Sequence, residues 1–198
     1  MKPVPSTVGW GAVALAWIVA VTLGMRVLLA YEYTAGAAAA APNAWPQSTH
    51  VPAPRQRPAL VLLMHPQCSC SRATLSELAR LMAHVHGRVD AYVLMLDPFS
   101  GRNDEWAQSH LWTTAAAIPG VRVMLDHDGA DARRFGASTS GQALLYDISG
   151  RLRFNGGITD ARGHEGDNAG RASLESLLLH GTAATGHTSV FGCGLFAS

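Results

Sequence analysis

Charged side chains are scarce in this 198-residue chain, where Asp, Glu, Lys and Arg make up only 15% and the net charge is +1. A disordered chain combines high charge with low hydrophobicity, so the 48% of apolar residues excludes disorder. Beyond residue 54 the chain has 13 Arg against 13 Asp and Glu. No basic excess remains to neutralise phosphates, which argues against nucleic-acid binding.

Cysteines and familiar catalytic loops are scarce as well. The chain has three cysteines, an odd number and too few for a disulfide scaffold. It has no Walker loop and no GxSxG, HExxH or GxGxxG motif. The common phosphate, serine-hydrolase, zinc-protease and dinucleotide chemistries are therefore not indicated.

One long apolar run is present, over residues 8–25, and Arg26 and the apolar VLLAY follow it. A membrane-spanning helix needs about 20 mostly apolar residues, so the sequence predicts one anchor over residues 1–33 and excludes a polytopic protein. We expect residues 8–31 to cross a bacterial inner membrane once, with the C-terminal part in the periplasm. A cleaved signal peptide is the alternative, because the small residues AGAAAAA at 35–41 could hold a cleavage site.

Residues 34–58 join alanines and glycines to five prolines within 17 residues. Such a composition is typical of an extended spacer, so we expect a linker here. A domain over residues 59–181 and a cysteine-containing tail over residues 182–198 would follow it.

Short apolar runs alternate with helical patterns in this expected domain. Strands are predicted over 59–64, 89–96, 121–126, 142–147 and 152–159, and helices over about 71–87, 103–115, 130–137 and 168–178. Helices alternate with strands early in the domain, and a hairpin comes late. The expected fold class is therefore α/β, a mixed sheet with helices on both faces.

Cys68 and Cys70 fall where the first strand meets the first helix. The free N–H groups and the dipole of a helix N-terminus stabilise a thiolate and make it a nucleophile. We interpret the two as a reactive pair, with Cys68 as the nucleophile and Cys70 as its partner; two inert cysteines are the alternative. Cys193, in the glycine-rich VFGCGLF, could resolve a mixed disulfide, fix the tail or complete a metal site.

This order of elements, with cysteines at the start of the first helix, resembles the thioredoxin fold. The stretches HPQCSCSRATLSELARLM (65–82), FNGGITDARGHEGDNAG (154–170) and VFGC (190–193) resemble the RedB family of membrane-anchored thioredoxin-like proteins. The resemblance implies a thiol or redox role outside the cytoplasmic membrane. It is compatible with a thiol–disulfide oxidoreductase that acts on a protein thiol partner without a cofactor.

The spacing of the cysteines departs from the Cys-x-x-Cys motif of thioredoxins. If Cys68 matches the first cysteine, Ser71 occupies the second position; if Cys70 matches the second, Gln67 occupies the first. Neither alignment keeps both roles.

The thioredoxin arrangement brings two loops to the cysteines. The first, residues 139–141, ends in Gly141 and has no proline, where thioredoxins have a cis-proline. The second, residues 162–168, carries His164, which could hold a proton or pair with a thiolate.

Metal binding is the main alternative. His65, Cys68 and Cys70, with Cys193 or His164, are soft ligands suited to copper or zinc. Exported copper proteins of thioredoxin fold use a longer cysteine spacing and a late histidine, and this chain lacks that match. A non-catalytic redox-sensing module on the same fold is the third hypothesis.

Overall fold

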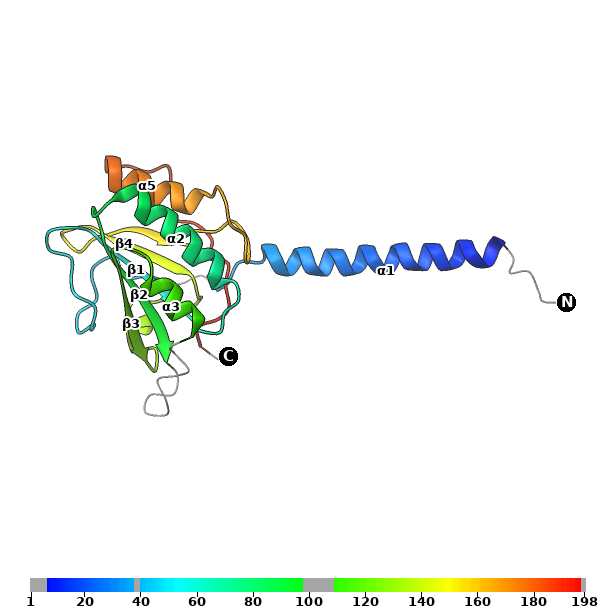
Figure 1. Cartoon of the computed structure of the whole chain (residues 1–198), viewed down its shortest axis with the longest axis horizontal. Helices are drawn as coiled ribbons and strands as arrows, with labels where there is room; N and C mark the ends of the chain where they lie inside the picture. The colour runs from blue at the N-terminus through cyan, green and yellow to red at the C-terminus, as the bar shows by residue number, and fades with distance from the viewer. Residues whose placement is uncertain (1–6, 38–39, 98–108, 197–198) are drawn as a thin grey trace. The chain divides into compact units, whose positions relative to one another are not determined.

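A computed structural model describes residues 7–37, 40–97 and 109–196 (Figure 1). The chain divides into two units, Met1–Thr34 and Ala35–Ser198. In the first unit, helix α1 spans Thr7–Tyr33. Its segment Gly9–Tyr33 has a mean hydropathy of 2.2, and among the described residues it is the one helix long and apolar enough to cross a membrane. Length and composition suit a membrane span or a signal sequence equally.

The second unit contains a five-stranded sheet in the order β3-β2-β1-β4-β5. Its strands are β1 Ala59–Met64, β2 Asp90–Asp97, β3 Val121–His127, β4 Gln142–Tyr146 and β5 Leu152–Gly156. The first three are parallel, whereas β4 pairs antiparallel with both β1 and β5. The predicted mixed sheet with a late hairpin is confirmed.

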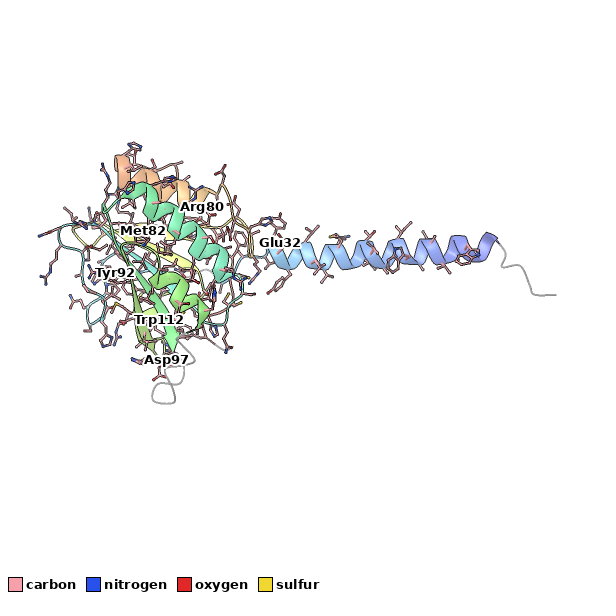
Figure 2. All side chains as sticks on the ribbon, in the orientation of Figure 1. Glu32, Arg80, Met82, Tyr92, Asp97 and Trp112 are labelled. Atoms are coloured by element: carbon pink, nitrogen blue, oxygen red, sulfur yellow. The ribbon has the colours of Figure 1, made fainter. Side chains whose placement is uncertain are left out.

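Three helices, α2 (Ser71–Val85), α3 (His110–Ala116) and α5 (Ala169–His180), contribute to the core on one face of the sheet. Met82 of α2 and Trp112 of α3, labelled in Figure 2, belong to this face. On the other face the short α4 (Ala130–Arg134) packs on β2 and β3. Alternate residues of β1 enter the two cores, as the pleat of a strand requires. Helices on both faces, as expected, complete a thioredoxin-like fold. Part of the helix predicted from residue 103 lies outside the described residues.

Residues 42–51, which we call the strap, pack on the second face. The Trp45 ring lies edge-on to Phe135 and Tyr146, with centroids 5.2 and 5.1 Å away. The Tyr146 hydroxyl donates to the Pro42 carbonyl at 3.0 Å, and Val51 is 3% exposed. An unpacked spacer over all of 34–58 is therefore wrong for the strap, because α4 alone leaves apolar surface that Trp45 covers.

The C-terminal segment, residues 186–196, also belongs to the second unit rather than forming a separate tail. Its first part runs along β5, where the N–H of Asn155 donates to the carbonyl of Gly186 at 2.9 Å and that of Gly157 to Ser189 at 3.2 Å. A Cβ at Gly156 would lie 2.2 Å from the Thr188 hydroxyl, so glycine is required for this close approach. Leu195 is 3% exposed in the core of the second face.

Candidate functional site

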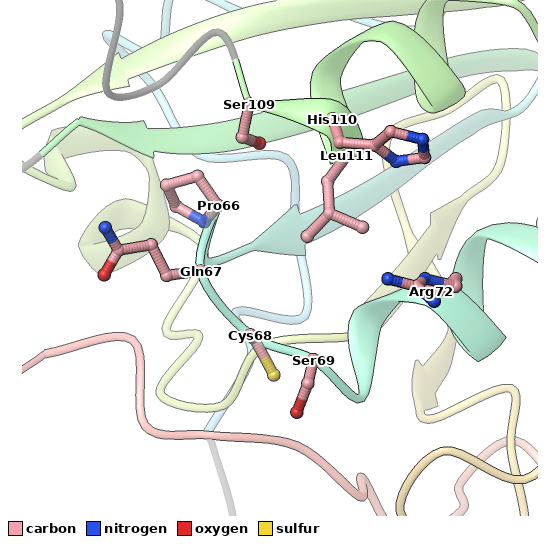
Figure 3. A pocket seen from close by; sticks show the side chains of 8 residues that line it. All are labelled: Pro66, Gln67, Cys68, Ser69, Arg72, Ser109, His110 and Leu111. Carbon is pink, nitrogen blue, oxygen red and sulfur yellow. The ribbon is translucent and has the colours of Figure 1, made fainter.

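Cys68 lies in the turn between β1 and α2, shown in Figure 3. Its N–H donates to the His65 carbonyl at 3.0 Å, and its own carbonyl accepts from the Ser71 N–H at 3.1 Å. Cys70 is the N-cap residue of α2. This tight turn holds Cys68 just ahead of the helix N-terminus, where the sequence predicted it.

The sulfur beside Cys68 is that of Cys193, at a distance of 3.1 Å. A disulfide bond is about 2.05 Å long, so both are free thiols in close contact. From the sequence we expected Cys70, two residues away, to be the partner of Cys68. Residues two apart point in different directions where a helix begins, whereas Cys193 approaches from the far end of the chain.

Cys68 is 2% exposed, and burial alone raises the pKa of its thiol. Hydrogen bonds from the Ser71 hydroxyl, from the thiol and N–H of Cys193 and from the N–H of Cys70 outweigh burial and lower the pKa to about 7. Donors directed at a sulfur stabilise its charged form. About half of the Cys68 thiol is therefore ionised near pH 7, far more than for an ordinary cysteine.

Cys193 is shifted the other way. Burial, its hydrogen bond to Cys68 and the negative charge on Cys68 raise the pKa of Cys193 to about 12, and Arg162 opposes the shift. When both sulfurs are protonated, Cys68 donates to Cys193; once Cys68 loses its proton, Cys193 becomes the donor. The two sulfurs titrate as a pair, with the charge on Cys68 and the remaining proton on Cys193.

Two serines extend the contacts of Cys68 to the loop before β4. The Ser71 and Ser140 hydroxyls are 2.9 Å apart, and the His65 N–H donates to the Ser140 oxygen at 2.9 Å. If Ser71 donates to the Cys68 thiolate, Ser140 donates to Ser71. The predicted approach of loop 139–141 to the cysteines is confirmed. No pattern in the sequence points to Ser140, whereas Ser71 occupies the position of the second cysteine of Cys-x-x-Cys.

Gly141 has the backbone role that its position indicates. Its φ of +91° lies in the region that favours glycine, and its N–H donates to the Leu63 carbonyl at 2.8 Å. A Cβ there would lie 3.1 Å from the Thr74 hydroxyl. Gly141 therefore turns the chain into β4 and places Ser140 against the helix start.

The last part of the C-terminal segment forms a short antiparallel contact with this loop. The Ser140 N–H donates to the Cys193 carbonyl at 2.8 Å, and the Leu195 N–H donates to the Ser138 carbonyl at 2.9 Å. A Cβ at Gly192 would lie 1.9 Å from the carbonyl oxygen of Ser140, so only glycine permits this approach. The glycine-rich sequence around Cys193 was the available signal.

The proposed metal ligands do not form one group. Nδ1 of His65 accepts from the Gln67 N–H at 3.2 Å, and burial lowers the pKa of this histidine. His164 is exposed in its loop, and the neighbouring Glu165 accepts from the Ser76 hydroxyl at 2.9 Å. Over the ranges that the structure describes, no three His, Cys, Asp or Glu side chains are placed to hold a metal ion.

A groove of about 210 Å³ opens beside the turn (Figure 3). Arg72 and His110 lie on its α2 and α3 sides and can offer hydrogen-bond donors to a ligand there. Its lining consists of Pro66, Gln67, Cys68, Ser69, Arg72, Ser109, His110 and Leu111.

The chain thus has a thioredoxin-like fold with two thiols in contact. No protein-family model and no curated protein matches the chain. Among solved structures it is similar to a hypothetical protein of Sinorhizobium meliloti, with 20% identity and TM-score 0.58 over 82% of this chain and 93% of that one. An uncharacterized conserved protein of Geobacillus kaustophilus gives 15% identity and TM-score 0.60 over 84% and 93%.

The exposed lipoprotein thioredoxin Etrx1 of Streptococcus pneumoniae gives 14% identity and TM-score 0.45, over 62% of this chain and 84% of that one. At 15% and 20% identity, the first two likenesses show the fold alone.

Proposed function

We propose that this chain carries out thiol–disulfide exchange with a protein partner, with Cys68 as the nucleophile and Cys193 as the second thiol. The observation that carries the proposal is the 3.1 Å contact between the two sulfurs, with a pKa of about 7 for Cys68. A thiolate at neutral pH beside a protonated thiol is the pairing that exchange requires.

The reaction takes two steps. The Cys68 thiolate attacks one sulfur of a substrate disulfide, so that a mixed disulfide forms and the first substrate thiolate leaves. Cys193 then loses its proton and attacks the Cys68 sulfur, which releases the second substrate thiolate. Two electrons pass to the substrate and a Cys68–Cys193 disulfide remains; the reverse sequence oxidises a substrate dithiol.

We also propose that α1 anchors the chain in a bacterial inner membrane with the second unit in the periplasm, as in the RedB family. The exposed, uncharged surface of α1 before Arg26 supports an anchor. An oxidising compartment supports cysteines that cycle through a disulfide.

The test uses full-length protein in detergent, equilibrated in glutathione buffers of increasing oxidised fraction. Free thiols are alkylated and disulfides are mapped by mass spectrometry. We expect a Cys68–Cys193 disulfide in wild type and in Cys70→Ser, and its loss in Cys193→Ser. A Cys68–Cys70 disulfide would support the Cys-x-Cys pair instead, and three free thiols in every buffer would contradict exchange.

A further inference from the structure

We infer that residues 192–195 occupy, as a displaceable strand, a backbone edge that takes up an extended cysteine-bearing polypeptide with glycine immediately before its cysteine. The inference rests on the proposed exchange at Cys68 and names the substrate class of that site. The chain's own C-terminal segment is then a tethered substitute for the substrate.

Access to Cys68 is the first step. Cys68 lines the groove beside the turn but is only 2% exposed, too little to meet a protein disulfide, and the residue beside its sulfur, Cys193, belongs to the C-terminal segment. Moving that segment aside would remove the Cys193 sulfur and uncover the nucleophile.

The contacts of the segment divide it into two parts. Residues 186–190 are held by β5 and by the Gly36 N–H, which donates to the Val190 carbonyl at 2.8 Å. Residues 193–195 are held separately, by main-chain bonds to Ser138 and Ser140 and by the burial of Leu195 in the core of the second face. The second part can therefore leave its edge while the first part stays in place.

The edge under the second part has the pattern of a strand that accepts another strand. Ser140 offers an N–H and Ser138 offers a carbonyl, and the two bonds to Cys193 and Leu195 follow the antiparallel pattern. Extended polypeptides bind exposed sheet edges through such main-chain bonds, while side-chain positions give specificity.

Two positions next to Cys193 define that specificity. A Cβ at position 192 would strike the Ser140 carbonyl, at 1.9 Å, so a bound polypeptide needs glycine before its cysteine. Leu195 is 3% exposed, so an apolar residue two positions after the cysteine would enter the core of the second face. The expected recognition sequence is Gly-Cys-x-apolar in an extended conformation.

The first test compares Gly192→Ala with Gly194→Ala in reduced full-length protein. The added methyl group at 192 meets the Ser140 carbonyl, whereas at 194 the nearest atom is the Phe196 oxygen of the same segment, at 3.3 Å. Iodoacetamide labelling of Cys68 at about pH 10, where an exposed cysteine is ionised even without the hydrogen bonds from Cys193, is followed by mass spectrometry. We expect Gly192→Ala to speed labelling about tenfold or more, because the site opens locally, and Gly194→Ala to change it less than about twofold.

The second test measures binding of a fluorescent synthetic copy of residues 188–196 with serine in place of Cys193. We expect saturable binding to Gly192→Ala full-length protein and none to wild type, whose own strand fills the edge. The same peptide with alanine before the serine should not bind.

The outcomes separate this inference from the proposed function. Unchanged labelling of Gly192→Ala, or faster labelling without peptide binding, overturns the tethered-substrate inference even if the Cys68–Cys193 disulfide forms. Peptide binding with no disulfide in any glutathione buffer supports peptide binding at the edge formed by Ser138 and Ser140 and overturns the proposed thiol–disulfide exchange.

Discussion

The two faces of the sheet are closed in different ways. On one face three helices, α2, α3 and α5, supply most of the cover. On the other, α4 is five residues long, and the strap and Leu195 and Phe196 of the C-terminal segment complete the cover. Regular elements close the first face with hydrogen bonds of their own, whereas the second face depends on segments that must be held by contacts with the rest of the unit.

This difference bears on the site. Cys68 and Ser71 come from the turn and helix of the first face, and Cys193 comes from a segment of the second. The nucleophile thus lies on a turn and helix with their own hydrogen bonds, whereas its partner lies on a segment that can detach. Such a division suits exchange, because the partner sulfur must withdraw while a substrate is bound.

The largest expected effect comes from opening one cavity in each core. Phe154, on the helical face, and Phe135, on the strap face, are both 0% exposed. Phe→Ala in a core costs about 3–5 kcal/mol, less where the surroundings can collapse. We expect Phe154→Ala to lie near the top of that range and Phe135→Ala near the bottom, because the strap can move inward. Urea unfolding of full-length protein in detergent, followed by far-UV circular dichroism, measures both; the reverse order would contradict the comparison.

The next effect comes from loosening the strap itself. Trp45→Ala removes two edge-on ring contacts and buried apolar surface, so we expect a loss of about 2–3 kcal/mol. Trypsin should then cleave faster after Arg55, which is exposed just beyond the strap. Trp112→Ala is the matched control, since Trp112 is also partly buried but lies on α3. Equal acceleration in both variants would show that the strap has no separate stability.

Local patterns predicted the helical face well. The apolar spacing of Leu75, Leu78 and Met82 predicts α2. Asn168 caps α5 by accepting from the Arg171 N–H at 2.8 Å, as its place before an apolar helix indicates. The strap was misread because proline content describes local stiffness. It does not reveal that the Trp45 ring packs against Phe135 and Tyr146, which lie about 90 residues or more further along the chain.

The candidate site divides in the same way. Cys68 was predicted because a strand, a turn and a helix start are adjacent in sequence. The contact between Cys193 and Cys68 joins residues 125 positions apart, and no local pattern in the sequence predicts such a contact. The three glycines 156, 157 and 192 permit that pairing, but glycine alone does not tell which backbone will approach it.

A smaller effect tests the helical half of the site. Ser71→Ala removes one of four hydrogen bonds that lower the Cys68 pKa. A hydrogen bond to a charged group contributes about 1.5 kcal/mol or more, so we expect the pKa to rise from about 7 by roughly one unit. The pH dependence of Cys68 alkylation measures it. Ser71→Thr, which keeps the hydroxyl, should restore the wild-type profile, and Ser69→Ala, in the same turn but exposed, should leave it unchanged; a shift in Ser69→Ala would contradict a specific role for Ser71.

The smallest effect is the pH dependence of the strap's attachment. Asp131 accepts from the Thr49 hydroxyl at 2.8 Å and from the His50 N–H at 3.2 Å. Burial raises the pKa of Asp131, but these bonds and the His50 ring outweigh it, so the pKa is lower in the folded chain. For neighbouring Asp126 burial dominates, and its pKa is raised.

The two carboxyl groups therefore act on stability with opposite signs. The contribution of Asp131 is present above its unfolded pKa, about 3.9, and is lost as pH falls through the lower folded pKa. That of Asp126 is present at low pH and is lost as pH rises through its higher folded pKa. Unfolding free energies from about pH 6 down to about pH 2.5 should fall less steeply in Asp131→Asn than in wild type, and more steeply in Asp126→Asn. If Asp131→Asn has the wild-type slope, its carboxylate does not hold the strap, and the Trp45 ring contacts and the Tyr146–Pro42 hydrogen bond hold it instead.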